Sequence, residues 1–219
     1  MAIYDRQLIA AFLSNGQNGE LIPAQAQALD GKERVPPFAT EIVSISPALY
    51  GVGLADLSQA LDGKLRVAQP ITRDSRVYLV GEGDWRQQKL SGWSPGEVAD
   101  LLGQAGMPAV KVVSIVADSL GRSSDDSLRL AFPDSFASAF HRILKETWHI
   151  RTTVHARVVD VVVSSGTEDS SLPGYIAKGR KLTAVKDYTG SPSRQSYHQP
   201  QSKVAFSWNG DVQHTDWKY

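Results

Sequence analysis

Cysteine is absent from all 219 residues, which excludes disulfide bonds, zinc–thiolate sites and a cysteine nucleophile. An excess of one charge is lacking too, since 23 Lys and Arg residues balance 23 Asp and Glu residues. No overall field therefore attracts the chain to nucleic acid or to a membrane surface. Any site for an anion must come from basic side chains that the fold gathers locally.

Long hydrophobic runs are missing as well. The longest β-rich apolar stretch, Val158 to Val163, is interrupted by Asp160 and is far shorter than the ~20 residues of a membrane-spanning helix. The first residues, MAIYDRQLIAAF, lack a basic segment followed by an apolar block. We therefore expect a soluble chain with no membrane span and no Sec-type signal.

Strand-like and helix-like segments alternate through the first three quarters of the chain. Ser94-Pro95-Gly96-Glu97 is a capping-box signature with proline at the first helical position. The run from Val110 to Val116 is typical of a strand buried in a parallel sheet, Asp134 is expected to cap a helix, and Thr152 to Ser164 is expected to form one long strand. The alternation predicts an α/β fold with a mostly parallel central sheet flanked by helices.

The remainder of the chain, residues 166–219, is rich in Gly, Ser, Pro and basic residues. Its strand-like pieces predict a C-terminal β-hairpin flap. We expect a single domain over residues 1–219, with the core at about 3–165, the flap and last strand at about 166–208, and a tail at 209–219.

Three segments near the ends of expected strands carry a family pattern. They read Leu79-Val80-Gly81-Glu82-Gly83, Leu90-Ser91-Gly92-Trp93-Ser94 and Val116-Ala117-Asp118-Ser119-Leu120. In this order they resemble Leu-Val-Gly-His-Gly, Leu-Ser-Gly-Tyr-Ser and Val-Gly-Cys-Ser-Leu of the self-processing cysteine protease domain of RTX (MARTX) and clostridial glucosylating toxins. Weaker similarities at the start, in the flap and near the end extend the resemblance over roughly residues 3–208. The resemblance implies a caspase-like fold.

Both residues of the family's catalytic dyad are replaced. Glu82 stands at the histidine position and Asp118 at the cysteine position. A cysteine protease needs a thiolate and a histidine that activates it, so we expect a pseudoprotease without cysteine-protease activity. The alternative is a hydrolase with a new carboxylate-based or metal-assisted site at Glu82 and Asp118, because two close carboxylates shift each other's pKa. We favour the inactive form and expect no bound metal.

The toxin proteases are activated by inositol hexakisphosphate in a basic pocket, and the resemblance implies such a pocket here. The positions that match are all basic: Lys32, Arg76, Arg180, Lys181 and Lys203. Planar guanidinium groups bind phosphate through two hydrogen bonds, and lysine adds point charge. We therefore expect inositol hexakisphosphate or a similar polyanion as ligand.

The resemblance also implies a cellular role. We expect a secreted bacterial effector or toxin module that acts in the host cytosol together with an unidentified protein partner. Trp85 and the tail Asp216-Trp217-Lys218-Tyr219 are candidates for partner contact, because exposed aromatic side chains often anchor interfaces. A purely structural partner protein, with neither ligand nor activity, is a third hypothesis.

Overall fold

The computed structural model describes residues 4–14, 21–30, 35–36, 39–46, 71–124, 133–163, 181–186, 192–196 and 202–218. The elements in chain order are β1 (Gln7–Phe12), α1 (Leu21–Asp30), β2 (Thr40–Ile45), β3 (Arg76–Val80), β4 (Gly83–Asp84), β5 (Lys89–Leu90), α3 (Pro95–Gln104), β6 (Val112–Val116), α4 (Phe136–Glu146), β7 (Thr153–Arg157), β8 (Val161–Val163), β9 (Lys181–Lys186), β10 (Pro192–Ser196), β11 (Lys203–Asn209) and β12 (Val212–Lys218).

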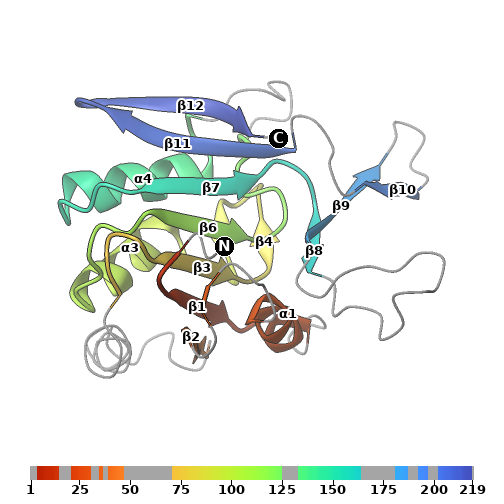
Figure 1. The fold of residues 1–219 in the computed structure, drawn as a ribbon. Coiled ribbons are helices and arrows are strands. Elements are labelled where there is room, and N and C mark those ends of the chain that lie inside the picture. Colours follow the sequence, from red (N-terminus) through yellow and green to blue (C-terminus); the bar gives the residue numbers. More distant parts are fainter. Residues whose placement is uncertain are drawn as a thin grey trace.

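A seven-stranded sheet forms the centre of the described part, in the order β12-β11-β7-β6-β3-β1-β2 (Figure 1). Strands β2, β1, β3, β6 and β7 pair in parallel, whereas β11 pairs antiparallel with β7 and with β12. A smaller antiparallel sheet, β10-β9-β8, lies beside it. The predicted α/β class is confirmed: a mostly parallel sheet flanked by helices, with a C-terminal antiparallel hairpin, is consistent with a caspase-like layout.

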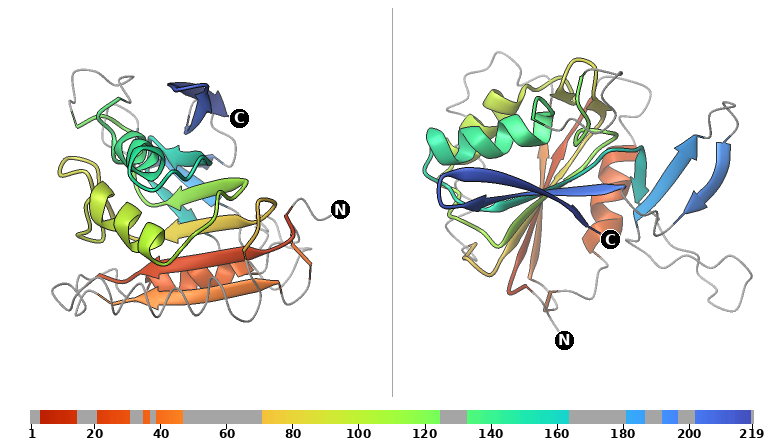
Figure 2. Two further views of the ribbon diagram at one scale, coloured as in Figure 1. Left: turned by 90° about the vertical axis from the view of Figure 1, so that its left-hand side faces the viewer. Right: turned by 90° about the horizontal axis from the view of Figure 1, so that it is seen from above.

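The two faces of the central sheet are covered differently (Figure 2). Helices α3 and α4 cover one face, where the larger core includes Val77, Val113, Val154 and Val204 from successive strands. Helix α1 and strand β8 cover part of the opposite face, in a smaller core with Ile9 and its neighbours. Because side chains alternate along a strand, the residues between the members of the larger core point to the opposite face.

Local signals at the helix starts are partly confirmed. Ser94 caps α3 in a complete capping box, with its side chain accepting from Glu97 N and the Glu97 carboxylate accepting from Ser94 N. The cap of α4 is Ser135, whose side chain accepts from Ser138 N, so the expectation of Asp134 is wrong by one residue. The Asp134 carboxylate instead accepts a hydrogen bond from the Ser124 hydroxyl, and it therefore does not cap α4.

The expected long strand from Thr152 to Ser164 is wrong, because it is two strands in different sheets. The chain leaves the main sheet after Arg157, and the Val159 carbonyl accepts from Ser119 N. The Asp118 carboxylate then accepts from Val161 N at 2.8 Å, at the first residue of β8. Most of the segment expected as a tail is also strand: β12 forms the edge of the main sheet.

A buried histidine joins α4 to the C-terminal hairpin. His141 has 0% of its surface exposed, and its Nε2 lies 3.0 Å from the Thr152 carbonyl oxygen. The carbonyl only accepts, so Nε2 carries the proton, and Nδ1 accepts from the Gln213 amide at 2.7 Å. The ring stacks on Trp208 with centroids 4.7 Å apart. Burial lowers the pKa of His141 from 6.5 to about 4, so the ring is neutral near pH 7.

Acidic pH should therefore destabilise the folded state, because unfolding allows His141 to bind a proton. The folded-state pKa lies below the unfolded value, so the unfolded chain binds the extra proton between about pH 6.5 and pH 4, and stability falls as the pH falls through this window. We expect a loss of about 3 kcal/mol from this group. Urea unfolding at several pH values measures it, with His141→Gln as the control that lacks the titrating ring. Equal pH slopes for the two proteins would contradict the assignment.

Candidate functional site

The carboxyl ends of β3 and β6 lie side by side, which brings the two dyad positions to neighbouring strand ends. Gly81 N donates to the Val116 carbonyl at 3.2 Å. A Cβ atom added to Gly83 would lie 2.1 Å from the Asp118 carbonyl oxygen and 2.6 Å from its nitrogen. The backbones approach this closely because residue 83 has no side chain. Glu82 and Asp118 therefore occupy adjacent turns, as the sequence predicts.

Ser91 holds the ends of β1 and β3 together. Its hydroxyl donates to the Phe12 carbonyl at 2.6 Å and accepts from Glu82 N at 2.9 Å, while its own N–H donates to the Glu82 carbonyl at 2.7 Å. Ser91 adopts a φ of 48° and Gly92 a φ of 89°, in the left-handed region where side chains are disfavoured. Such strained backbone is common around binding sites.

A cavity of about 820 Å³ opens at this edge of the sheet. It is lined by Ser14, Glu82, Gly83, Asp84, Trp85, Arg86, Gln87, Lys89, Ser91 and Gly92. We call this space the cleft. It lies beyond the carboxyl ends of β1 and β3, where ligands bind in open parallel sheets.

The two carboxylates at the strand ends have different surroundings. Glu82 is exposed and lines the cleft. Asp118 is half-buried, and its Oδ1 accepts from Val161 N at 2.8 Å, which aims that oxygen at the start of β8. Neither side chain replaces a thiolate, because a carboxylate is a weak nucleophile toward an amide. Among the described residues, no three His, Asp or Glu side chains form a group that would hold a metal ion.

The five predicted ligand residues are only partly described. Lys32 and Arg180 lie outside the described residues, and Lys181 is described as the first residue of β9 without its side chain. Arg76 and Lys203 both lie on the sheet face opposite α3 and α4, because their neighbours Val77 and Val204 belong to the larger core. The structure thus places these two cations on one face, although at different ends of it.

The pairing of residues across the strands gives the distance between Arg76 and Lys203. Arg76 is level with Val112 on β6, and Val112 with Thr153 on β7. Lys203 instead pairs with Arg157, further along β7 toward the carboxyl edge. At ~3.3 Å per residue and ~4.8 Å per strand, the Cα atoms of Arg76 and Lys203 are about 20 Å apart. One phosphate group does not reach both.

Arg76 is a buried cation between two aromatic rings. It is 3% exposed, and its Cζ lies 3.8 Å from the Tyr4 ring centroid and 4.9 Å from that of Tyr78. Its Nη1 donates to the Tyr78 hydroxyl. The Nε–H is buried without a hydrogen-bond partner. Among the described residues, no carboxylate forms an ion pair with Arg76, so its burial is offset there by the two rings and by the Tyr78 hydroxyl.

Other basic side chains also lie on this face, and the sequence analysis did not predict them as ligand residues. Lys111 Nζ lies 5.7 Å from the Tyr4 ring centroid, beside Arg76. His155 and Arg157 alternate with the buried Val154 and Ala156 on β7. The signal was present in Thr153–Arg157, where polar and apolar residues alternate, but nothing local shows that these side chains share a face with Arg76.

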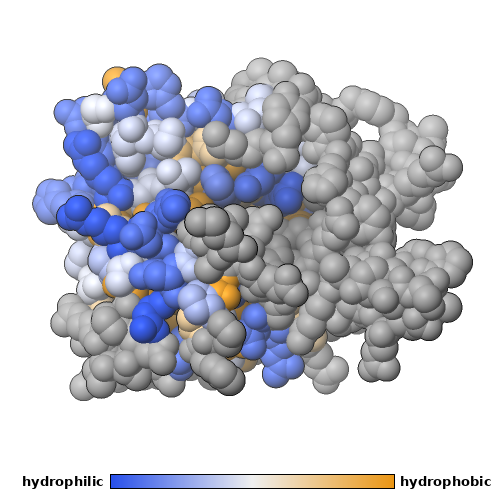
Figure 3. Space-filling model, in the orientation of Figure 1, coloured by the Kyte–Doolittle hydropathy of each residue, from blue (hydrophilic) through white to orange (hydrophobic). Residues whose placement is uncertain are grey.

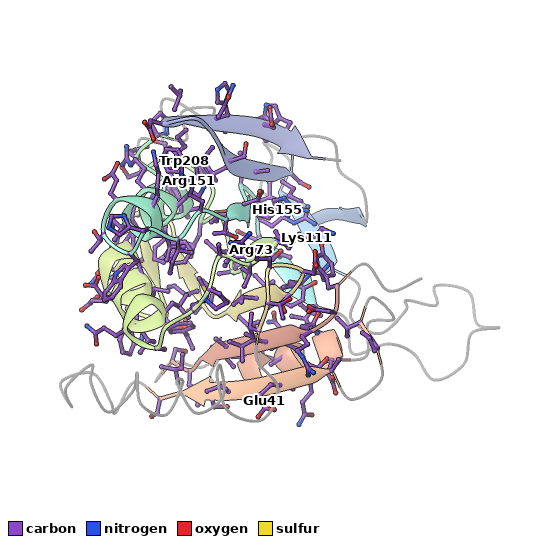
Figure 4. The ribbon with its side chains drawn as sticks, turned by 60° about the vertical axis from the view of Figure 1, so that its left-hand side comes forward. Glu41, Arg73, Lys111, Arg151, His155 and Trp208 are labelled. Atoms are coloured by element: carbon purple, nitrogen blue, oxygen red, sulfur yellow. The ribbon has the colours of Figure 1, made fainter. Side chains whose placement is uncertain are left out.

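We call the residues Arg76, Lys111, His155, Arg157 and Lys203 the basic face. In Figure 3, hydrophilic side chains are interspersed with less polar ones on the described part of the molecule, and Figure 4 labels Lys111 and His155, which lie near each other in that view. Burial lowers the pKa of the Arg157 guanidinium, whose Nη1 donates to the Ser202 hydroxyl at 2.7 Å. One acidic residue, Asp216 on β12, lies on this face among the described strand residues.

Comparison with known proteins does not assign this chain to a family. The chain matches no family model, and a search of curated proteins finds no match either. No described helix is long and apolar enough to cross a membrane.

The close contact between the two strand ends makes Gly83→Ala a sharp test of this geometry. We expect a loss of about 2 kcal/mol or more in stability, because the added methyl group overlaps the Asp118 backbone. Chemical denaturation measures it. The control is Gly96→Ala, where the nearest atom to the new Cβ is 4.0 Å away and where replacing glycine in a helix is neutral or favourable. Equal stability of the two variants would mean that the strand ends are further apart.

Proposed function

We propose that this protein is a catalytically inactive relative of the toxin self-processing cysteine proteases that binds inositol hexakisphosphate or a similar polyanion on its basic face. In this role it serves as an interaction module of a bacterial effector or toxin that acts in the host cytosol. The observation that carries the proposal is Arg76, a buried guanidinium with an unpartnered Nε–H.

The physical argument starts from the cost of burying this charge. A buried cation without a carboxylate is unfavourable, and cation–π contacts return only about 1–2 kcal/mol. A phosphate oxygen would satisfy the Nε–H and neutralise the charge. Tyr4 is half-exposed and covers the guanidinium, so the phosphate reaches Nε once this ring moves aside.

The spread of the cations favours a ligand with several anionic groups. Lys111 lies near Arg76, whereas Arg157 and Lys203 are paired across β7 and β11. A single phosphate neutralises one end of this row, while a polyphosphorylated ligand contacts cations along it. Binding to the folded state only would also stabilise the fold, and this stabilisation rises with the logarithm of the ligand concentration once the ligand exceeds its Kd. Ligand-rich cytosol would then act as the signal.

The loss of protease chemistry is supported by the strand ends. The chain has no thiol, and the Asp118 carboxylate is occupied with Val161 N. Asp118 is not among the residues that line the cleft. These contacts favour a structural role for Asp118 over the alternative of a carboxylate-based hydrolase.

Calorimetric titration with inositol hexakisphosphate at about 0.15 M salt tests the proposal, because this salt screens diffuse attraction. We expect a Kd of about 1 µM or tighter. Arg76→Gln and Lys111→Gln should each weaken binding about tenfold, since each removes a charge-assisted contact. The matched control is Arg142→Gln on α4, which lies against the other face.

Two further arms complete this experiment. Arg180→Ala/Lys181→Ala tests the flap residues and should weaken binding as well. Incubation with the ligand should produce no self-cleavage and no cleavage of an added peptide. Absence of binding by the unaltered chain, or equal weakening by Arg142→Gln, would overturn the proposal of a polyanion site.

A further inference from the structure

We propose that strand β12 joins this protein to a second copy of itself, through antiparallel pairing of the two β12 strands about a twofold axis at Thr215. β12 is the outermost strand at one edge of the central sheet, and among the described strands it pairs with β11 alone. In Figure 1 it lies along the outer side of β11. The pairing would join the central sheets of the two copies into one continuous sheet.

The two edges of the central sheet differ in exposure. At β12, Val212 is 63% exposed, and residues 214–216 are exposed as well. At the opposite edge, Ser44 is the one exposed residue of β2, and the other residues of that strand are half-buried or buried. An exposed edge strand offers backbone N–H and C=O groups to another strand. β12 is therefore the more accessible edge of the described sheet.

Backbone hydrogen bonds alternate along a strand, and this alternation shows which groups of β12 point outward. Val158 N donates to the Ser202 carbonyl at 3.1 Å, so Ser202 and every second residue after it face β7. The residues between them, beginning with Lys203, face β12 and lie opposite its even-numbered residues. The odd-numbered residues of β12 therefore direct their backbone groups away from β11: Gln213, Thr215 and Trp217.

An antiparallel pair centred on Thr215 matches the two strands along their whole length. It places Thr215 opposite Thr215, and Gln213 opposite Trp217 of the other copy. Outward-directed backbone groups thus meet each other, which is the arrangement in which paired residues exchange two hydrogen bonds. The threonine pair on the axis is also a favourable combination of side chains across two strands.

The charged side chains of β12 are complementary in this register. His214 of each copy lies opposite Asp216 of the other, in the type of pair whose side chains approach most closely. An imidazole donates an N–H in either protonation state, and a carboxylate accepts several hydrogen bonds. Asp216 can therefore add this contact to those that it makes within its own chain. The twofold axis repeats the pair, so the interface holds it twice.

Neighbouring registers are less favourable. Moving the axis by one residue toward the turn places His214 opposite His214, and moving it the other way places Asp216 opposite Asp216. Both shifts keep the outward-directed backbone groups matched, but they put like side chains on the axis and shorten the overlap. Like charges directly opposite each other destabilise a strand pair. The sequence of β12 therefore favours one register for its own copy.

This interface leaves the residues of the basic face unused. Val204 and Phe206 belong to the larger core beneath α3 and α4, so Lys203 and the even-numbered residues of β12 lie on the opposite face. A twofold axis between antiparallel strands of one sheet runs perpendicular to that sheet. Dimerisation would therefore place the basic faces of the two copies side by side on the same surface.

Sedimentation velocity over a concentration series of about 1 to about 200 µM tests the proposal, and we expect a monomer–dimer equilibrium with a Kd of about 50 µM. His214→Asp and Asp216→Lys should each weaken dimerisation at least about tenfold, because each places like charges opposite each other. An equimolar mixture of the two variants should restore the dimer, since a carboxylate of one then lies opposite the ammonium of the other. Asp30→Lys is the control, an exposed acid at the end of α1, which packs against β1 and β2.

Thr215→Pro tests the backbone part of the interface. Proline removes an N–H that points away from β11, so the hairpin keeps its own hydrogen bonds while the pair on the axis is lost. We expect a monomer with an unchanged far-ultraviolet circular dichroism spectrum. Thr215→Val is the matched control, because it keeps the N–H and the β-branched shape and should still form the dimer. If the proline variant does not fold, the mixture of charge variants decides.

The remaining outcomes would overturn the proposal. A monomer at every concentration would exclude a second copy as the occupant of this edge. A dimer that persists in His214→Asp, Asp216→Lys and Thr215→Pro would place the interface away from β12, and a mixture of charge variants that stays monomeric would exclude this register. Because Thr215→Pro leaves the basic face unaltered, its binding of inositol hexakisphosphate is an independent readout, and failure of one proposal does not imply failure of the other.

Discussion

The contact between the backbones of Gly83 and Asp118 determines the geometry of the carboxyl edge. Because residue 83 lacks a side chain, the turn after β3 lies directly against the turn after β6. The position of this turn places Ser91 where its hydroxyl joins Phe12 to Glu82. The cleft is the space left beyond these joined strand ends. A bulkier residue at position 83 would force these two turns apart, because its side chain would overlap the Asp118 backbone.

The balanced net charge of the chain conceals a sheet face on which basic side chains gather. Strand alternation places Arg76, His155 and Lys203 on the sheet face that α3 and α4 leave open, whereas Glu82 lies at the edge of the sheet beside the cleft.

The differences between the expected and the observed elements share a cause. The sequence from Thr152 to Ser164 has the composition of one strand, but the Asp118 carboxylate binds Val161 N and β8 joins another sheet. The segment Val212–Lys218 resembles a tail because it lacks long apolar runs, yet it pairs along the whole of β11. In both cases a distant partner decides the conformation, and local propensity does not report distant partners.

Four features could be predicted from the sequence alone: the α/β class, the capping box at Ser94, the absence of a thiol and the position of Glu82 and Asp118 at adjacent strand ends. These features depend on periodicity, on side-chain chemistry and on the general rules of parallel sheets. Three other features depend on how the chain folds: Lys111, His155 and Arg157 share a face with Arg76, the Asp118 carboxylate accepts from β8, and Ser14 lines the cleft. The physical reason is that cross-strand register and close backbone contacts join residues far apart in the chain, and no local pattern encodes that register.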